Sequence, residues 1–160
     1  MKRLKKLFII LSLIGLAGCG FSPMLKNVDM DNINITNIQY SGNDEMIYLL
    51  KNNINLEKSK RLKEGYTVKI NIIKNVLSAT KNTSGVTTQE QITVIVNLSI
   101  LNSKGIEINY DQIKDSRVID VTNVITTDSE TSRTATNNLI TNISRKLIFS
   151  IKANILQDQK

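Results

Sequence analysis

The sequence predicts an α+β fold, a two-layer sandwich in which two helices cover one face of a four-stranded, mostly antiparallel sheet. Apolar and polar residues alternate in residues 66–72, 92–100 and 106–121, which is the period of half-buried strands. Residues 44–56 and 127–155 instead repeat apolar residues every three or four positions, as amphipathic helices do. Segments with one apolar face each pack most simply in two layers.

A short strand followed by a helix precedes the central strands. Residues 33–40 alternate loosely, with Ile33, Ile35 and Ile38 as the apolar positions. Ser41 or Asn43 offers a side-chain oxygen to the free N–H groups of the helix that follows. The predicted element order is therefore β-α-β-β-β-α.

Turn-forming residues separate the three central strands. Gly65 ends a charged connection before the strand that starts at Tyr66. Ser, Thr and Asn dominate residues 78–87, where we expect a polar loop. Asn102–Gly105 is a short turn, because its glycine accepts a positive φ, and an irregularity is expected near residues 112–116 of the last strand.

The second helix has a long apolar stripe. Thr127 and Glu130 match a capping box, in which each side chain bonds the backbone N–H of the other residue. The stripe then extends over about six turns. Its residues are Ala135, Leu139, Ile140, Ile143, Leu147, Ile148, Ile151 and Ile155.

The first residues match a bacterial lipoprotein signal peptide. A basic segment that contains Lys2, Arg3, Lys5 and Lys6 precedes the apolar run Leu7–Ala17. That run is shorter than the roughly 20 residues that a membrane-spanning helix needs.

The apolar run ends in Leu16-Ala17-Gly18-Cys19, the lipobox pattern, in which small residues admit a peptidase and the cysteine thiol is acylated. Two or three acyl chains hold a protein firmly to a membrane, whereas one holds it reversibly. We expect residues 1–18 to be the signal peptide, 19–31 the lipidated Cys19 and an extended lead-in, and 32–160 a single domain.

Composition argues against several classes of function. Four of the 21 basic residues lie in the signal peptide, so the rest of the chain has 17 basic and 14 acidic residues. This small positive net charge argues against a general nucleic-acid binder. The sequence has no His, and Cys19 is its one cysteine. Zinc ligands and the commonest nucleophile–base pairs are therefore lacking, so we expect neither an enzyme nor a bound metal or cofactor.

Two features are candidates for binding. Lys58, Lys60, Arg61 and Lys63 form a basic cluster after the first helix, either as a solvated loop or as a contact for anionic groups. The polar loop expected at residues 78–87 is a possible partner contact, although solvent exposure alone explains its composition.

The lipobox continues into Gly20-Phe21-Ser22-Pro23, and the predicted elements follow in the order given above. In these features the chain resembles the LPS-assembly lipoprotein LptE family over nearly its whole length. The resemblance implies a non-enzymatic protein, anchored by its lipid on the periplasmic side of the outer membrane. There it plugs the large LptD β-barrel, assists its assembly and helps pass lipopolysaccharide (LPS) to the cell surface.

If LPS is bound, its phosphates favour the basic cluster, with Arg133 as a weaker candidate. Two alternatives stay open. One is an accessory or pilot lipoprotein of another envelope machine, and the other is a lipid-anchored enzyme.

Overall fold

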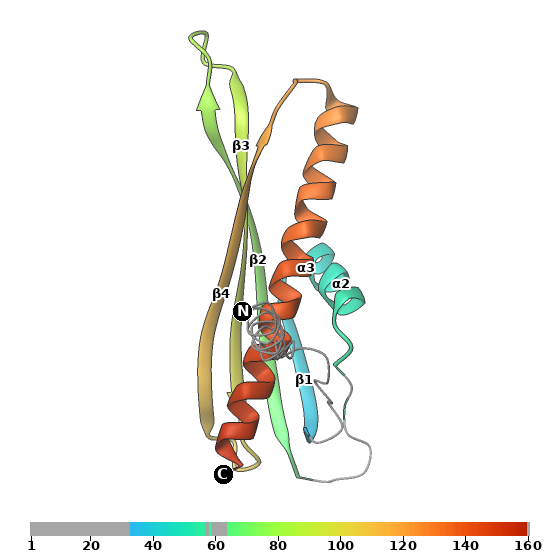
Figure 1. The fold of residues 1–160 in the computed structure, drawn as a ribbon, viewed down its shortest axis with the longest axis vertical. Helices are drawn as coiled ribbons and strands as arrows, with labels where there is room; N and C mark the ends of the chain where they lie inside the picture. The colour runs from blue at the N-terminus through green and yellow to red at the C-terminus, as the bar shows by residue number, and fades with distance from the viewer. Residues whose placement is uncertain (1–32, 57, 59–63, 160) are drawn as a thin grey trace, which may run out of the picture. The chain divides into compact units, whose positions relative to one another are not determined.

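The computed structural model describes residues 33–56, 58 and 64–159, which belong to a compact unit spanning Asp31–Lys160 (Figure 1). The α+β class and the order β-α-β-β-β-α are confirmed. The elements are β1 (Ile35–Gly42), α2 (Asp44–Asn53), β2 (Tyr66–Lys81), β3 (Thr87–Leu101), β4 (Glu107–Asp120) and α3 (Ile125–Asp158).

The four strands form one sheet in the order β1-β2-β3-β4. β2, β3 and β4 are antiparallel neighbours, joined by tight turns, whereas β1 is parallel to β2. A parallel pair needs a crossover connection, and α2 lies within it. The sheet is therefore mixed, with one parallel pair at its edge.

The core lies between one face of the sheet and the two helices. Ile70 pairs with Leu98, and Ile72 pairs with Val96, and these side chains have at most 1% of their surface exposed. Both helices contact the sheet and each other, as Figure 1 shows. Each such apolar side chain contributes about 1.5–3 kcal/mol when buried. From the helices, the fully buried side chains are Met46, Leu50, Ile140, Ile143, Leu147, Ile151 and Ile155.

α2 begins at Asp44 as predicted, and of the two predicted caps, Ser41 and Asn43, Asn43 is the N-cap. The Asn43 side chain accepts a hydrogen bond of 3.1 Å from the Met46 N–H. The helix ends at Asn53, three residues before the predicted end, because Ile54 has an extended backbone. The Ile54 N–H makes the last helical hydrogen bond, to the Leu50 carbonyl.

The predicted capping box of α3 is wrong. The helix begins at Ile125, before Thr127, and its N-cap Val124 makes no side-chain cap bond. Asp128 instead accepts hydrogen bonds of 2.8 Å from both the N–H and the hydroxyl of Thr122. The bond from the Thr122 N–H holds the pKa of Asp128 below its ordinary value. The first turn of α3 is thus tied to the segment that leaves β4.

Two interruptions predicted in the strands are absent. β2 continues to Lys81 and β3 starts at Thr87, so residues 78–87 contain two strand ends and not a loop. β4 is likewise continuous through residues 112–116, and its pairing shifts only between Ile100 and Leu101 of β3. In both places polar side chains hide the strand from a hydrophobic pattern, although the backbone pairs with its neighbour. Pairing is regular in residues 112–116 of β4, whereas its register shifts between Ser78 and Lys81 of β2.

The turns at the two ends of β3 have the same construction. Asn82 and Asn102 each accept, through Oδ1, two backbone N–H bonds of 3.0 Å from residues two and four positions later. Gly85 and Gly105 follow at the same place in each turn, with φ of +81° and +76°. Both turns use asparagine to satisfy the backbone and glycine for the left-handed residue.

A hydrogen bond joins the last residue of α3 to the first residue of β2. The Tyr66 hydroxyl donates to Asp158 Oδ2 at 2.9 Å. Burial, followed by this bond and the Asp158 charge, raises the pKa of Tyr66 above its ordinary value of 10.0. Residues 92 positions apart are thereby connected.

We expect Gly42→Ala to destabilise the domain more than Gly85→Ala. Both glycines have positive φ, which costs about 1–2 kcal/mol in any L-residue with a Cβ. A Cβ at Gly42 would also overlap the Ile72 carbonyl, so overpacking adds about 1–3 kcal/mol to the cost of Gly42→Ala. A Cβ at Gly85 would meet no atom of the described residues, so Gly85→Ala carries no such cost. Urea unfolding of the two variants measures the difference, and equal losses would contradict the close approach of β1 to β2.

We expect Tyr66→Phe to lower the free energy of unfolding at pH 8 by about 0.5 kcal/mol, since the lost bond is partly solvent-exposed. Because the folded pKa of Tyr66 is raised, the tyrosine's contribution is complete below pH 10.0 and is lost as the pH rises through the folded value. The difference between wild type and variant should therefore close in unfolding curves recorded at higher pH. A difference that stays constant across that range would mean that the bond is not formed.

Candidate functional site

The structure places only part of the predicted binding set. Cys19, Lys60, Arg61 and Lys63 lie outside the described residues. Lys58 lies in the connection after α2, is exposed, and donates a 3.4 Å hydrogen bond from Nζ to Asn37 Oδ1 of β1. The described end of the basic cluster is thus close to the β1 edge of the sheet.

Arg133 is held in an ion pair on the surface of α3. Its Nε lies 3.0 Å from Glu130 Oε2 and its Nη2 lies 2.8 Å from Glu130 Oε1. This two-pronged bond and the opposite charges lower the pKa of Glu130 and raise that of Arg133. A guanidinium that already binds a carboxylate offers less of its charge to a phosphate.

Lys58 and Arg133 lie toward opposite edges of the sheet. Glu130, the partner of Arg133, lines a hollow of about 260 Å³ together with Arg117 and Ile119 of β4. β4 and β1 are the two outer strands. The structure therefore does not gather the two described candidates into one anion site, and it adds Arg117 as an exposed cation on the β4 side.

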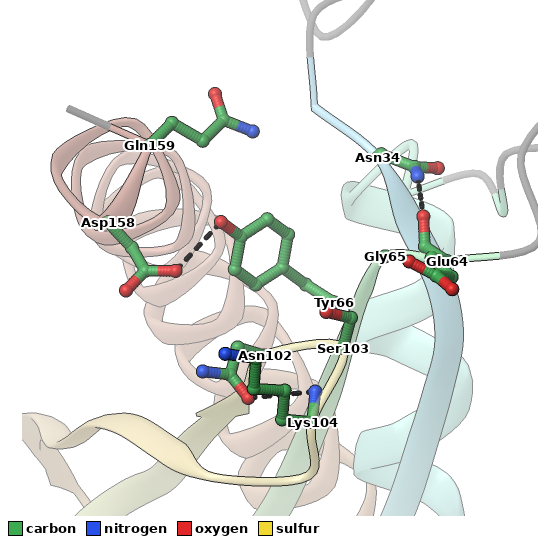
Figure 2. Close-up of a pocket in the computed structure, with 9 residues that line it drawn as sticks. All are labelled: Asn34, Glu64, Gly65, Tyr66, Asn102, Ser103, Lys104, Asp158 and Gln159. Carbon is green, nitrogen blue, oxygen red and sulfur yellow. Dashed lines mark hydrogen bonds between the residues drawn. The ribbon is translucent and has the colours of Figure 1, made fainter.

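A second hollow, of about 460 Å³, lies where the start of β2, the β3–β4 turn and the end of α3 meet (Figure 2). Its charged lining residues are Glu64, Lys104 and Asp158, and Asp158 bonds Tyr66 across it. The end of a helix also carries a partial negative charge, and the last turn of α3 has no basic residue. The balance of charge is negative, so this hollow does not suit a phosphate.

The described residues include no group of three or more acidic, His or Cys residues placed to hold a metal ion. Across the same part of the chain, no helix has the length and apolar character needed to cross a membrane.

The face of the sheet away from the helices bears a polar row that crosses all four strands. Ser41, Asn71, Asn97 and Gln112 are paired in register from β1 to β4. Asn71 donates to the Ser41 hydroxyl at 3.0 Å, and Gln112 donates to Asn97 Oδ1 at 2.9 Å. Alternation along each strand predicted polar residues on this face, but only the register shows that they form a row.

Comparison with known proteins finds likeness in fold and not in sequence. No protein-family model matches the chain, and no curated protein does. Several solved structures share the fold. The rare lipoprotein B of Shewanella oneidensis is 10% identical with a TM-score of 0.58, over 78% of this chain and 99% of that one.

The minor lipoprotein of Acinetobacter baumannii is 12% identical with a TM-score of 0.56, over 76% of this chain and 94% of that one. Lipoprotein B of Nitrosomonas europaea is 10% identical with a TM-score of 0.58, over 76% and 84%. The two-layer arrangement of β1–β4 under α2 and α3 is therefore a fold found in proteins of three bacteria.

Proposed function

We propose that this protein is a lipid-anchored lipoprotein of the LptE type and not an enzyme. Cys19 attaches it to the periplasmic side of the outer membrane, where it plugs and helps assemble an LptD-type β-barrel and assists delivery of LPS to the cell surface. The observation that carries the proposal is a lipobox at Cys19 joined to a fold shared with three proteins that are named as lipoproteins.

The chemistry of the described surface supports a role in binding rather than catalysis. The row from Ser41 to Gln112 is uncharged, and its amides and hydroxyls both donate and accept hydrogen bonds. Such side chains are less costly to bury against a partner than charges, which are depleted from the centres of protein interfaces. A domain that fills the interior of another protein needs surfaces of this kind on more than one side.

For contact with LPS, the proposal relies on Lys58 and the three basic residues that follow it in the sequence. Lys58 is exposed, and its described partner is the neutral Asn37 amide, so its charge is not neutralised there. Arg133 remains the weaker candidate, since Glu130 occupies its guanidinium.

We expect an LptD-type barrel to be recovered in stoichiometric amount when the tagged, lipidated protein is purified from detergent-solubilised envelopes. Mass spectrometry identifies the barrel and measures the mass of the acylated N-terminal peptide. Cys19→Ala is the control, because it removes the acyl site and should leave the precursor unprocessed.

Recovery of the components of another envelope machine would replace this proposal with the pilot or accessory lipoprotein. Turnover of an envelope substrate by the purified protein would replace it with the lipid-anchored enzyme.

We expect Lys58→Glu with Arg61→Glu to weaken binding of purified LPS, and to reduce the salt dependence of what remains, because charge contacts to phosphate are screened by salt. Arg145→Glu with Lys146→Glu is a matched control that reverses two exposed charges on α3. Binding is measured at low and at physiological salt. Equal losses in both double variants would indicate a general charge effect, and unchanged binding would remove the basic cluster from the proposal.

A further inference from the structure

The first ten residues of α3, 125–134, have no buried side chain. Ile125 is 87% exposed, and burial starts only at Ala135, the first residue of the apolar stripe that packs on the sheet. Helical segments of fewer than about 12 residues are marginal in water without such packing. We call residues 125–134 the strap, and Figure 1 shows it at the top of α3.

The sequence of the strap favours a helix only weakly. It contains four threonines and two serines, which are mediocre helix formers because their hydroxyls compete for backbone hydrogen bonds. The Thr131 hydroxyl, for example, donates to the Thr127 carbonyl at 2.9 Å. The N-cap, Val124, makes no side-chain cap bond. The ion pair of Arg133 with Glu130 lies within the strap and is exposed, so it adds little stability.

Few contacts tie the strap to the rest of the domain. Among the described residues, Asp128 is the one side chain of the strap that forms a hydrogen bond outside it, and it bonds Thr122. Thr122 is itself exposed and lies in the connection that leads from β4. The strap also borders the hollow of about 260 Å³ that it shares with Arg117 and Ile119 of β4. It therefore lies over the edge of the sheet without the close packing found along the rest of α3.

Both ends of the strap are held by the folded domain. The Val121 N–H bonds the Thr88 carbonyl at 2.9 Å, and Ala135 is buried. Between Val121 and the strap, Asn123 has a left-handed backbone with φ of +63°. Ten helical residues span about 15 Å. Residues 122–134 reach about 43 Å when extended, so the strap can unwind into a loop without moving either end.

We infer that the strap is a gate, which unwinds while the rest of the domain stays folded and thereby opens the hollow between α3 and β4. In the closed state Ile119, at the floor of the hollow, is 7% exposed. Unwinding opens this apolar floor to the solvent and leaves the exposed cation Arg117 at its margin. The inference concerns the domain alone and does not rest on the proposed function.

Amide hydrogen exchange of the full chain purified from envelopes tests the gate. Each N–H of residues 129–134 has a helical acceptor in the closed strap, so its exchange reports opening and not the free first turn. We expect these amides to exchange at least about a hundredfold faster than those of residues 139–151. Equal protection of the two ranges overturns the inference, because the strap would then unfold only with the whole domain.

A pair of proline variants measures whether the strap belongs to the cooperative core. Thr131→Pro lies in the strap, and Asn142→Pro is the matched control at another exposed position of α3. We expect Thr131→Pro to lower the urea midpoint by less than about a tenth, because the shortened helix accepts proline in its first turn. Asn142→Pro should lower it by at least about half, since proline breaks a helix interior. Equal losses, or failure of the Thr131→Pro variant to fold, overturn the inference.

Thiol labelling measures whether the gate opens the hollow. Ile119 and Ile113 lie on the same side of β4 and are both 7% exposed, but Ile119 lines the hollow whereas Ile113 pairs with the buried Val96. We expect a maleimide to label Ile119→Cys at least about tenfold faster than Ile113→Cys, with the unsubstituted protein as background for Cys19. Combination with Thr131→Pro should widen the difference. Equal labelling rates at the two positions overturn the inference.

Discussion

The fold depends on one apolar surface, the helix-facing side of β3. Ile92, Val94, Val96, Leu98 and Ile100 occupy alternate positions along this strand, and none has measurable exposed surface. β2 and β4 flank the strand, and α3 lies over it, while α2 packs on β1, β2 and α3. β2, β4 and α3 thus have this apolar surface as their common neighbour, and α2 completes the helical layer beside it.

α3 shows the dependence most clearly. Its 34 residues include many Thr, Asn, Ser and Ile, which are mediocre helix formers, and no side chain caps its start. Thr136, Thr141 and Ser144 even bond back to the carbonyl four residues earlier. Such a helix is held mainly by the sheet beneath it, since short-range preferences contribute little to its stability.

The sequence was sufficient for every element whose apolar period is complete. The stripe of α3, the alternation of β3 and the Asn43 cap all led to the correct element type. The hydrophobic pattern was misleading where polar residues form strands. It predicted a loop at residues 78–87 and an irregularity at residues 112–116, and both ranges contain strand. Repetition of Asn-x-x-Gly-(Val/Ile) at residues 82–86 and 102–106 was the signal that could have revealed the first as a second tight hairpin. The row from Ser41 to Gln112 depends on strand register, which spacing does not encode. The pairing of Arg133 with Glu130 was predictable, because residues three apart on a helix are neighbours.

The position of α3 after the strands in the sequence also governs how the domain folds. β2, β3 and β4 are joined by tight turns, so this meander forms early from local contacts. Its apolar surface then has no helical cover from α3 until the 34 residues of that helix have followed. β1 must wait as well, because its parallel pairing spans the crossover through α2. A chain that crosses a membrane before it folds would expose that apolar surface in transit, and a chaperone that shields extended apolar segments would protect it.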